Sequence, residues 1–304
     1  MLRAFAVAIA TFVLIAFALL EGGCGGASSP NPPSTGGASS GGSTSNSNPN
    51  QSNPAAVNGV WIHDAPTVAA HDPFGSQQTP VGALANLQSM KSFGITAIAA
   101  DCFTNPAFLS DDFAAAQSLG LSIAADIDLS VLFQHGATQF EMWHAESTAI
   151  SQYCTEFGNN RAAARTPDGR LIVWIYGTHQ MTAASWESAI AAVRLNSPDV
   201  FLVGDTSGPS PGFDGEWDFW PGSTTTVTTL MPQYTHPGND SGLSPDGGHR
   251  YSEQWQAAIA SKAPGVDINS WNSYADGSEI DDNQQLQSET AEYSSKYRSA
   301  MAAS

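Results

Sequence analysis

The chain has 304 residues, with 28 Asp and Glu against 10 Lys and Arg, so its formal charge at pH 7 is −18. A body this acidic repels nucleic acid and anionic membranes, which excludes both as partners bound by electrostatic attraction. A neutral polysaccharide is compatible with this charge, although the charge alone does not indicate one.

The first segment of the chain is typical of an exported protein. Arg3 is followed by a nearly unbroken apolar run to Leu20, and Glu21-Gly22-Gly23 then leads to Cys24. Small residues before a cysteine resemble a bacterial lipoprotein signal, although Glu21 is unusual there. We therefore predict a signal segment over residues 1–24 and export to the cell envelope. The lipid on Cys24 would be the only contact with a membrane, and simple secretion or a retained membrane helix are the alternatives.

Residues 25–56 consist almost entirely of Gly, Ser, Asn, Pro, Thr and Ala. Such a composition cannot bury enough apolar surface to offset the entropy of ordering, which predicts a disordered tether. Residues 57–304 then form one domain with a sizeable core. Cys102 and Cys154 lie in this domain, where they could form a disulfide or remain two free thiols.

From residue 57 onward, apolar runs alternate with helical patterns. The runs predict eight strands, and the helices between them are predicted over about 81–93, 113–119, 138–157, 182–194, 248–262 and 283–302. This alternation favours a parallel sheet, and eight strands in a domain of this length predict a (β/α)8 TIM barrel. An open doubly wound sheet is the alternative. The strands are predicted over 57–62, 95–100, 121–125, 171–175, 200–203, 213–219, 227–231 and 266–271.

Polar and aromatic residues recur where the predicted strands end. In a barrel these carboxyl ends converge on one face, so residues distant in the sequence meet in one pocket. No glycine-rich phosphate loop and no H-E-x-x-H motif occurs, so we predict no cofactor and no metal. The strand-end residues are Asp101, Asp128, Tyr176, Asp205, Tyr234 and Trp271.

Several segments, in order, carry a resemblance to known enzymes. They include Gly59-Val60-Trp61-Ile62-His63, the Trp-rich residues 213–221, Leu230-Met231-Pro232-Gln233-Tyr234, and Trp271-Asn272-Ser273-Tyr274-Ala275-Asp276. Together they resemble the glycoside hydrolase family 71 endo-α-1,3-glucanases and, more distantly, the family 99 endo-α-mannosidases. The resemblance covers most of residues 57–280. It implies a TIM barrel that hydrolyses an α-linked polysaccharide, and α-1,3-glucan in particular.

The chain departs from these families at one position. Their closing motif offers two carboxylates three residues apart, whereas this chain has Ser273 and Asp276. Glycoside hydrolysis uses an acid and a base, and a serine hydroxyl cannot act as the base without an activating partner. We predict Asp276 as the general acid, with Asp128 or else Asp205 as the second catalytic carboxylate. Glu279 is a further alternative.

Loss of the second carboxylate leads to two other hypotheses. One is a non-catalytic surface lipoprotein that binds glycan in the same pocket, and the other is an envelope protein whose barrel has no ligand. In the hydrolase and in the glycan-binding lipoprotein, aromatic rings would stack on sugar faces and polar groups would bind sugar hydroxyls. Buried core rings and a hydrogen-bonded core histidine are the structural alternatives, and Asp126 is expected to point into packing or a turn. The predicted substrate-binding residues are His63, Asp101, Trp174, Tyr176, Trp217, Trp220, Tyr234, Trp271, Asn272 and Tyr274.

Overall fold

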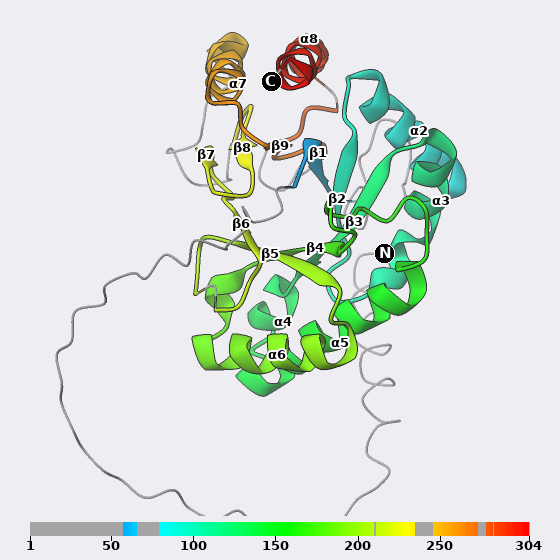
Figure 1. Ribbon diagram of the computed structural model, residues 1–304, viewed down its shortest axis with the longest axis vertical. Coiled ribbons are helices and arrows are strands. Elements are labelled where there is room, and N and C mark those ends of the chain that lie inside the picture. Colours follow the sequence, from blue (N-terminus) through cyan, green and yellow to red (C-terminus); the bar gives the residue numbers. More distant parts are fainter. Residues whose placement is uncertain are drawn as a thin grey trace, which may run out of the picture. The chain divides into compact units, whose positions relative to one another are not determined.

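The computed structural model describes residues 57–65, 79–209, 211–234, 246–272, 278–281 and 283–303. Nine strands within these ranges form a single sheet in the order β6-β5-β4-β3-β2-β1-β9-β8-β7 (Figure 1). The strands are β1 (Gly59–Asp64), β2 (Ala97–Asp101), β3 (Ser122–Asp128), β4 (Leu171–Tyr176), β5 (Val200–Asp205), β6 (Gly215–Trp217), β7 (Gly222–Ser223), β8 (Thr228–Leu230) and β9 (Gly265–Ile268).

Eight of the nine strands are parallel. Only the two-residue strand β7 runs antiparallel, against β8. The eight parallel strands correspond one by one to the eight predicted strands. Most of them are apolar because the sheet is covered on both faces, whereas β6 and β8 are short and partly polar. The predicted eightfold pattern is therefore confirmed.

The two ends of the sheet meet through side chains. Thr226, just before β8, accepts a hydrogen bond on Oγ1 from the backbone N–H of Glu216 in β6 at 2.9 Å. Thr224 donates from its hydroxyl to the Glu216 carbonyl. The sheet is thus nearly closed, with threonine hydroxyls in place of a backbone ladder at the last seam. This arrangement confirms the (β/α)8 barrel as the fold class.

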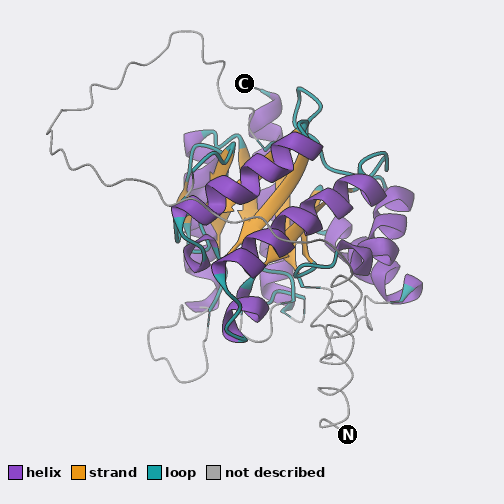
Figure 2. Cartoon of the chain, turned by 90° about the horizontal axis from the view of Figure 1, so that it is seen from below, coloured by secondary structure: helices purple, strands orange, loops and turns teal. Residues whose placement is uncertain are grey.

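Helices cover the outside of the sheet (Figures 1 and 2). The start of α2 is set by Thr79, whose side chain accepts from the Gly82 N–H, and α5 begins at a capping box formed by Thr138 and Glu141. Between β6 and β8 the chain forms β7 instead of a helix. The α-helices are α2 (Pro80–Ser92), α3 (Ser110–Leu119), α4 (Ser130–Gln134), α5 (Gln139–Phe157), α6 (Ala183–Asn196), α7 (His249–Ser261) and α8 (Gln284–Ala302). Short 3-10 turns lie at η1 (Pro106–Leu109), η2 (Thr178–Gln180) and η3 (Asp246–Gly248).

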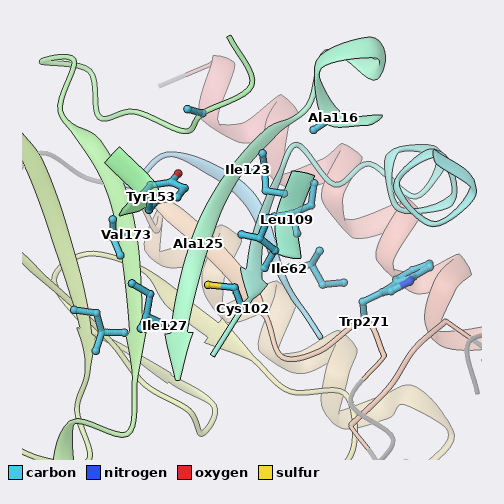
Figure 3. Close-up of a cluster of buried hydrophobic side chains, with 14 of the residues drawn as sticks. Ile62, Cys102, Leu109, Ala116, Ile123, Ala125, Ile127, Tyr153, Val173 and Trp271 are labelled. Carbon is cyan, nitrogen blue, oxygen red and sulfur yellow. The ribbon is translucent and has the colours of Figure 1, made fainter. Parts of the chain in front are cut away.

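The core has two layers, because successive residues of a strand point to opposite faces of the sheet. One buried cluster, which includes Ile62, Ile127 and Val173, lies between the strands and the helices (Figure 3). The other fills the inside of the barrel and includes Trp61, Trp174 and Trp217. Strand residues that alternate in step with Trp61, Trp174 and Trp217 therefore face the barrel interior. The polar residues at such positions are the ones that can form a site.

An ionic cluster supports the sheet near the start of β6. The Asp214 carboxylate pairs with Arg170 at 3.0 Å and with Arg194, and it also accepts from the Leu202 N–H at 2.9 Å. These partners come from the start of β4, the end of α6 and strand β5. Asp214 thus joins three elements at the end of the barrel opposite to the strand carboxyl ends.

The two cysteines of the domain are free thiols. Cys102 is buried directly after β2, and Cys154 is half-buried on α5. The disulfide considered from the sequence is therefore wrong. Burial raises the pKa of both thiols, which keeps them protonated.

No helix in the described part of the chain has both the length and the apolar content needed to cross a membrane.

Candidate active site

The strand ends bring one histidine and three aspartates into the barrel interior. His63 lies in β1, Asp101 ends β2, and Asp126 and Asp128 lie two residues apart in β3, so they share a face. Asp101 and Asp126 are paired in the parallel register of β2 and β3. These four side chains therefore form a single polar cluster at the carboxyl end of the barrel.

His63 lies between two carboxylates. Its Nδ1 is 3.2 Å from Asp126 Oδ2, and its Nε2 is 3.1 Å from Oδ2 of Asp267 in β9. The imidazole ring stacks on Trp217, with ring centroids 4.3 Å apart, and meets the edge of Trp174 at 5.1 Å. All of these side chains are buried. Trp174 and Trp217 were predicted to contact substrate, but both rings are buried and pack against the His63 ring.

The charge of His63 follows from these neighbours. Burial by itself lowers the pKa of the ring, but the carboxylates of Asp267 and Asp126 outweigh it, and the pKa of His63 rises to about 10. The ring is therefore an imidazolium across the neutral pH range. It offsets part of the negative charge in the barrel interior.

Asp101 and Asp128 are the more accessible carboxyl groups of the cluster, and both are half-buried. Burial, followed by the nearby charges of Asp128 and Asp126, raises the pKa of Asp101 well above its usual value. Burial also raises the pKa of Asp128 to about 6, against the opposing hydrogen bonds from the N–H and hydroxyl of Ser130, each 2.6 Å long. Asp128 thus changes its charge close to neutral pH, which suits a group that transfers protons.

Asp205 has a different environment. Its carboxylate is fully buried at the end of β5. It accepts hydrogen bonds from the N–H groups of Gly177, Thr178 and Ser207 and from the hydroxyls of Thr178 and Ser207. These five donors occupy the lone pairs of both oxygens, so Asp205 anchors the loop after β4 and has no free oxygen to offer a substrate.

Aromatic rings form one side of the site. Tyr176 packs against Phe219 with centroids 5.6 Å apart, Phe219 meets Trp220 at 5.6 Å, and Trp220 meets Tyr234 at 4.8 Å. The series runs from the buried Trp217 outward to Trp220, whose residue surface is 46% exposed. Three of the predicted substrate-binding residues, Tyr176, Trp220 and Tyr234, therefore lie together at the barrel mouth.

Trp271 does not lie at the mouth, and this corrects the prediction. It is fully buried in the layer between the strands and the helices (Figure 3), and its indole N–H donates to Asn86 Oδ1 of α2 at 3.1 Å. The next residue, Asn272, is also buried, and its Oδ1 accepts from the Ala65 N–H at 2.8 Å. Both residues hold the loops after β1 and β9 in place and do not face a substrate.

The predicted residues Asp276 and Tyr274, and Ser273 with them, lie outside the described residues. The flanks of their segment are described. Trp271 donates its N–H to the His63 carbonyl at 2.8 Å, and the Ser270 and Ser278 hydroxyls are 2.9 Å apart. The described residues on either side of this segment are thus held beside the carboxyl end of β1.

Sequence reasoning missed Asp126 and Asp267 as members of the site. Asp126 was expected to point into packing or a turn; it is indeed buried, but its carboxylate also pairs with His63. The sequence did indicate this position for Asp126. It precedes Asp128 by two residues, and residues two apart in a strand lie on the same face. Asp267 interrupts the apolar run of β9, and a charge inside a buried strand indicates a partner inside the barrel. Within the described ranges, no group of His, Cys, Asp or Glu side chains has an arrangement that could hold a metal ion.

The raised pKa of Asp128 predicts that the domain loses stability as pH rises. In the unfolded chain this carboxyl ionises near its usual 3.8, whereas in the folded state it keeps its proton to about pH 6. Protonation thus favours the folded state at low pH, and this contribution, about 2 kcal/mol, is lost as pH rises from 4 to above 6. His63 stays charged in the folded protein, but a histidine in the unfolded chain loses its proton near pH 6.5, so part of the His63 contribution is also lost above pH 6. The wild type and an Asp128 variant share this loss.

Urea unfolding at pH 4.5 and 7.5 measures this effect. The loss in unfolding free energy between the two pH values should be about 2 kcal/mol smaller in Asp128→Asn than in the wild type. Equal losses in the two proteins would contradict the assignment.

The fold is shared with solved glycoside hydrolases. Two structures of the family 99 endo-α-mannosidase from Bacteroides thetaiotaomicron superpose on this chain. In one, a complex with bis-tris propane, the TM-score is 0.66 at 16% identity, covering 81% of this chain and 99% of that one. In the other, the TM-score is 0.61 at 16% identity, covering 75% and 83%. No protein-family model and no curated protein matches the chain. These superpositions confirm the barrel fold. The resemblance to family 71 stays a prediction.

Proposed function

We propose that this protein is a glycoside hydrolase that acts on an α-linked polysaccharide, with α-1,3-glucan as its substrate. The observation that carries the proposal is the barrel mouth itself. There Asp101 and Asp128 lie beside the aromatic series from Tyr176 to Trp220. A pyranose presents C–H faces that pack on aromatic rings and hydroxyls that bind carboxylates, so a mouth with both features suits a neutral glycan.

In the proposed reaction, Asp276 is the general acid and Asp128 is the second carboxylate. The acid donates its proton to the glycosidic oxygen as the carbon–oxygen bond breaks, and the base removes a proton from the attacking water. Asp128 suits the second role because its pKa of about 6 leaves it ionised at neutral pH yet able to accept a proton. The role of Asp276 rests on the sequence motif and on the position of the flanking residues Ser270 and Ser278.

A glycan panel tests the proposal. The full chain is incubated with α-1,3-glucan, α-1,4-glucan and α-mannan, and new reducing ends are counted. We expect release from α-1,3-glucan and little from the others. Release of reducing ends from α-mannan alone would show that the enzyme is a glycoside hydrolase with α-mannan, not α-1,3-glucan, as its substrate. No release from any glycan, together with measurable binding, would overturn the hydrolase proposal.

The second candidate function is glycan capture without hydrolysis, and Ser273 is the observation that favours it. The variant Ser273→Glu restores the carboxylate that the related motifs carry. A wild type that binds but does not cleave, combined with cleavage by Ser273→Glu, would identify a degenerate site. Cleavage by the wild type would show that the partner of Asp276 lies elsewhere in the cluster.

We also propose that the protein is exported and lipid-anchored at Cys24. The support is the basic, then apolar, then small-residue pattern that ends at this cysteine, and residues 1–56 lie outside the described part of the chain. The mass of the mature protein checks this proposal. A mature N-terminus other than a lipidated Cys24 would contradict it.

A further inference from the structure

The barrel interior holds more carboxylates than the proposed reaction uses. Asp126 and Asp267 flank His63, and neither carboxylate faces the mouth as openly as Asp101 or Asp128, since their exposed fractions are 5% and 0%. Burying a carboxylate costs free energy unless a partner compensates it. Two buried acids on one histidine are therefore a specific arrangement whose effect on the rest of the site can be derived.

The arrangement pairs Asp126 with a cation. The His63 ring, charged by its two neighbours, lies 3.2 Å from Asp126 Oδ2, a distance at which an imidazolium and a carboxylate form an ion pair. Asp267, at 3.1 Å on the other ring nitrogen, keeps the ring protonated and oriented. Trp217, stacked on the same ring, excludes water from it. The three side chains form a fixed charge series from β9 through β1 to β3.

Asp126 stands next to the reactive pair. It is the register partner of Asp101 on the neighbouring strand, where Cα atoms lie roughly 5 Å apart, and it lies two residues from Asp128 on the same face, roughly 7 Å along the strand. A negative charge at this range disfavours a second and a third negative charge in the same low-dielectric interior. Beside burial, the Asp126 charge therefore contributes to the raised pKa of both Asp101 and Asp128.

The other charged groups around the pair do not replace this effect. From β5, Asp205 adds a weaker negative charge near Asp128. From α5, burial raises the pKa of the Glu146 carboxyl, which disfavours a further negative charge there. Strands β4 and β6 contribute only the rings of Trp174, Tyr176 and Trp217 to the interior of the site.

We propose that Asp267, His63 and Asp126 are positioning residues that set the ionisation of the Asp101–Asp128 carboxyl pair. Asp126 supplies the charge that acts on the pair, and His63 with Asp267 keeps that charge in place. The proposal rests on the proposed function only in that it gives Asp128 a catalytic task. The electrostatic relationship itself can be measured without any substrate.

Carboxyl titration by NMR tests the proposal directly. Protein labelled with ¹³C at the aspartate side chains is titrated from pH 4 to 8, and the Asp128 signal is the one that disappears in Asp128→Asn. The variant Asp126→Asn removes the neighbouring charge but keeps an oxygen to accept from His63. We expect its Asp128 midpoint to fall by about one pH unit, a tenfold weaker hold on the proton.

The matched control is Asp168→Asn. It also removes one aspartate carboxylate, but in the turn before β4 at the opposite end of the barrel, where Asp168 pairs with Arg170, and we expect the Asp128 midpoint to move less than a third as far. An unmoved midpoint in Asp126→Asn, in a variant that unfolds at the wild-type urea concentration, would overturn the proposal. So would equal shifts in the two variants. If Asp126→Asn does not fold, Asp126→Glu keeps the charge and should leave the midpoint within about 0.3 of wild type, and a shift beyond that range overturns the proposal.

The result is separable from the reaction. If the glycan panel shows no hydrolysis and the midpoint still falls in Asp126→Asn, the charge series is established and only its catalytic use is lost. If hydrolysis occurs and the midpoint does not move, the hydrolase stands and the positioning role fails. Where hydrolysis is measurable, the acid limb of the kcat/KM profile should move down with the Asp128 midpoint.

Discussion

Asp128→Asn lowers the rate of glucan hydrolysis about a thousandfold, and Asp276→Ala lowers it by a similar factor. The asparagine keeps an oxygen for the Ser130 N–H that now donates to Asp128, so the loop after β3 keeps its geometry. What is lost is the ability to take up and release a proton. Initial rates of reducing-end release at saturating α-1,3-glucan measure the loss in kcat.

A surface substitution of the same type is the control. Asp168 lies in the turn before β4, at the opposite end of the barrel, and it pairs with Arg170 at 2.9 Å. Asp168→Asn should keep hydrolysis within about twofold of wild type. Undiminished hydrolysis in Asp128→Asn would remove Asp128 from the proposed mechanism, and undiminished hydrolysis in Asp276→Ala would do the same for Asp276.

Trp271→Ala destabilises the domain by about 4 kcal/mol. The ring is fully buried between the strands and α2, packs near Phe93, and donates its N–H to Asn86. Truncation leaves a cavity of indole size and removes the donor from the buried Asn86 oxygen, and the two losses add. Urea unfolding followed by circular dichroism gives the change in the midpoint at constant slope.

Trp220 provides the matched comparison, because it is the same residue type with 46% of its surface exposed. Trp220→Ala should change the free energy of unfolding by less than about 0.5 kcal/mol and should instead weaken binding of α-1,3-glucan. Substitution of Trp271 should thus lower stability, whereas substitution of Trp220 should lower glucan binding. A stability loss at Trp220 equal to that at Trp271 would contradict the separation of mouth from core.

The fold was predictable because the barrel pattern is repeated along the sequence. Most strands are apolar runs bounded by turn residues, and tertiary packing did not override any of the eight. No helix was predicted between the sixth and seventh strands, and the structure has none there. There the chain turns into the short antiparallel strand β7, and this turn carries Phe219 and Trp220 to the mouth.

The site was predictable only in part. The strand-end rule placed Asp101, Asp128 and Tyr176 together, as they lie in the structure, because the carboxyl ends of parallel strands share one face. It misplaced Trp271, since a residue just past a strand end can turn outward as easily as inward. It also could not show that Asp205 is saturated by five donors, because those donors come from loops distant in the sequence. After the last residue of a strand, the sequence no longer predicts which way a side chain points.

The seam between β6 and β8 has a consequence for how the barrel accommodates a bulky ligand. Elsewhere, widening the cylinder would break a ladder of main-chain bonds, whereas among the described residues the bonds across this seam are made by the hydroxyls of Thr224 and Thr226. A hydroxyl can rotate to a water molecule and return, so the circumference can expand at this place at small energetic cost. Trp220 lies in the segment between β6 and β7, so this exposed ring is attached to the part of the wall that yields most easily.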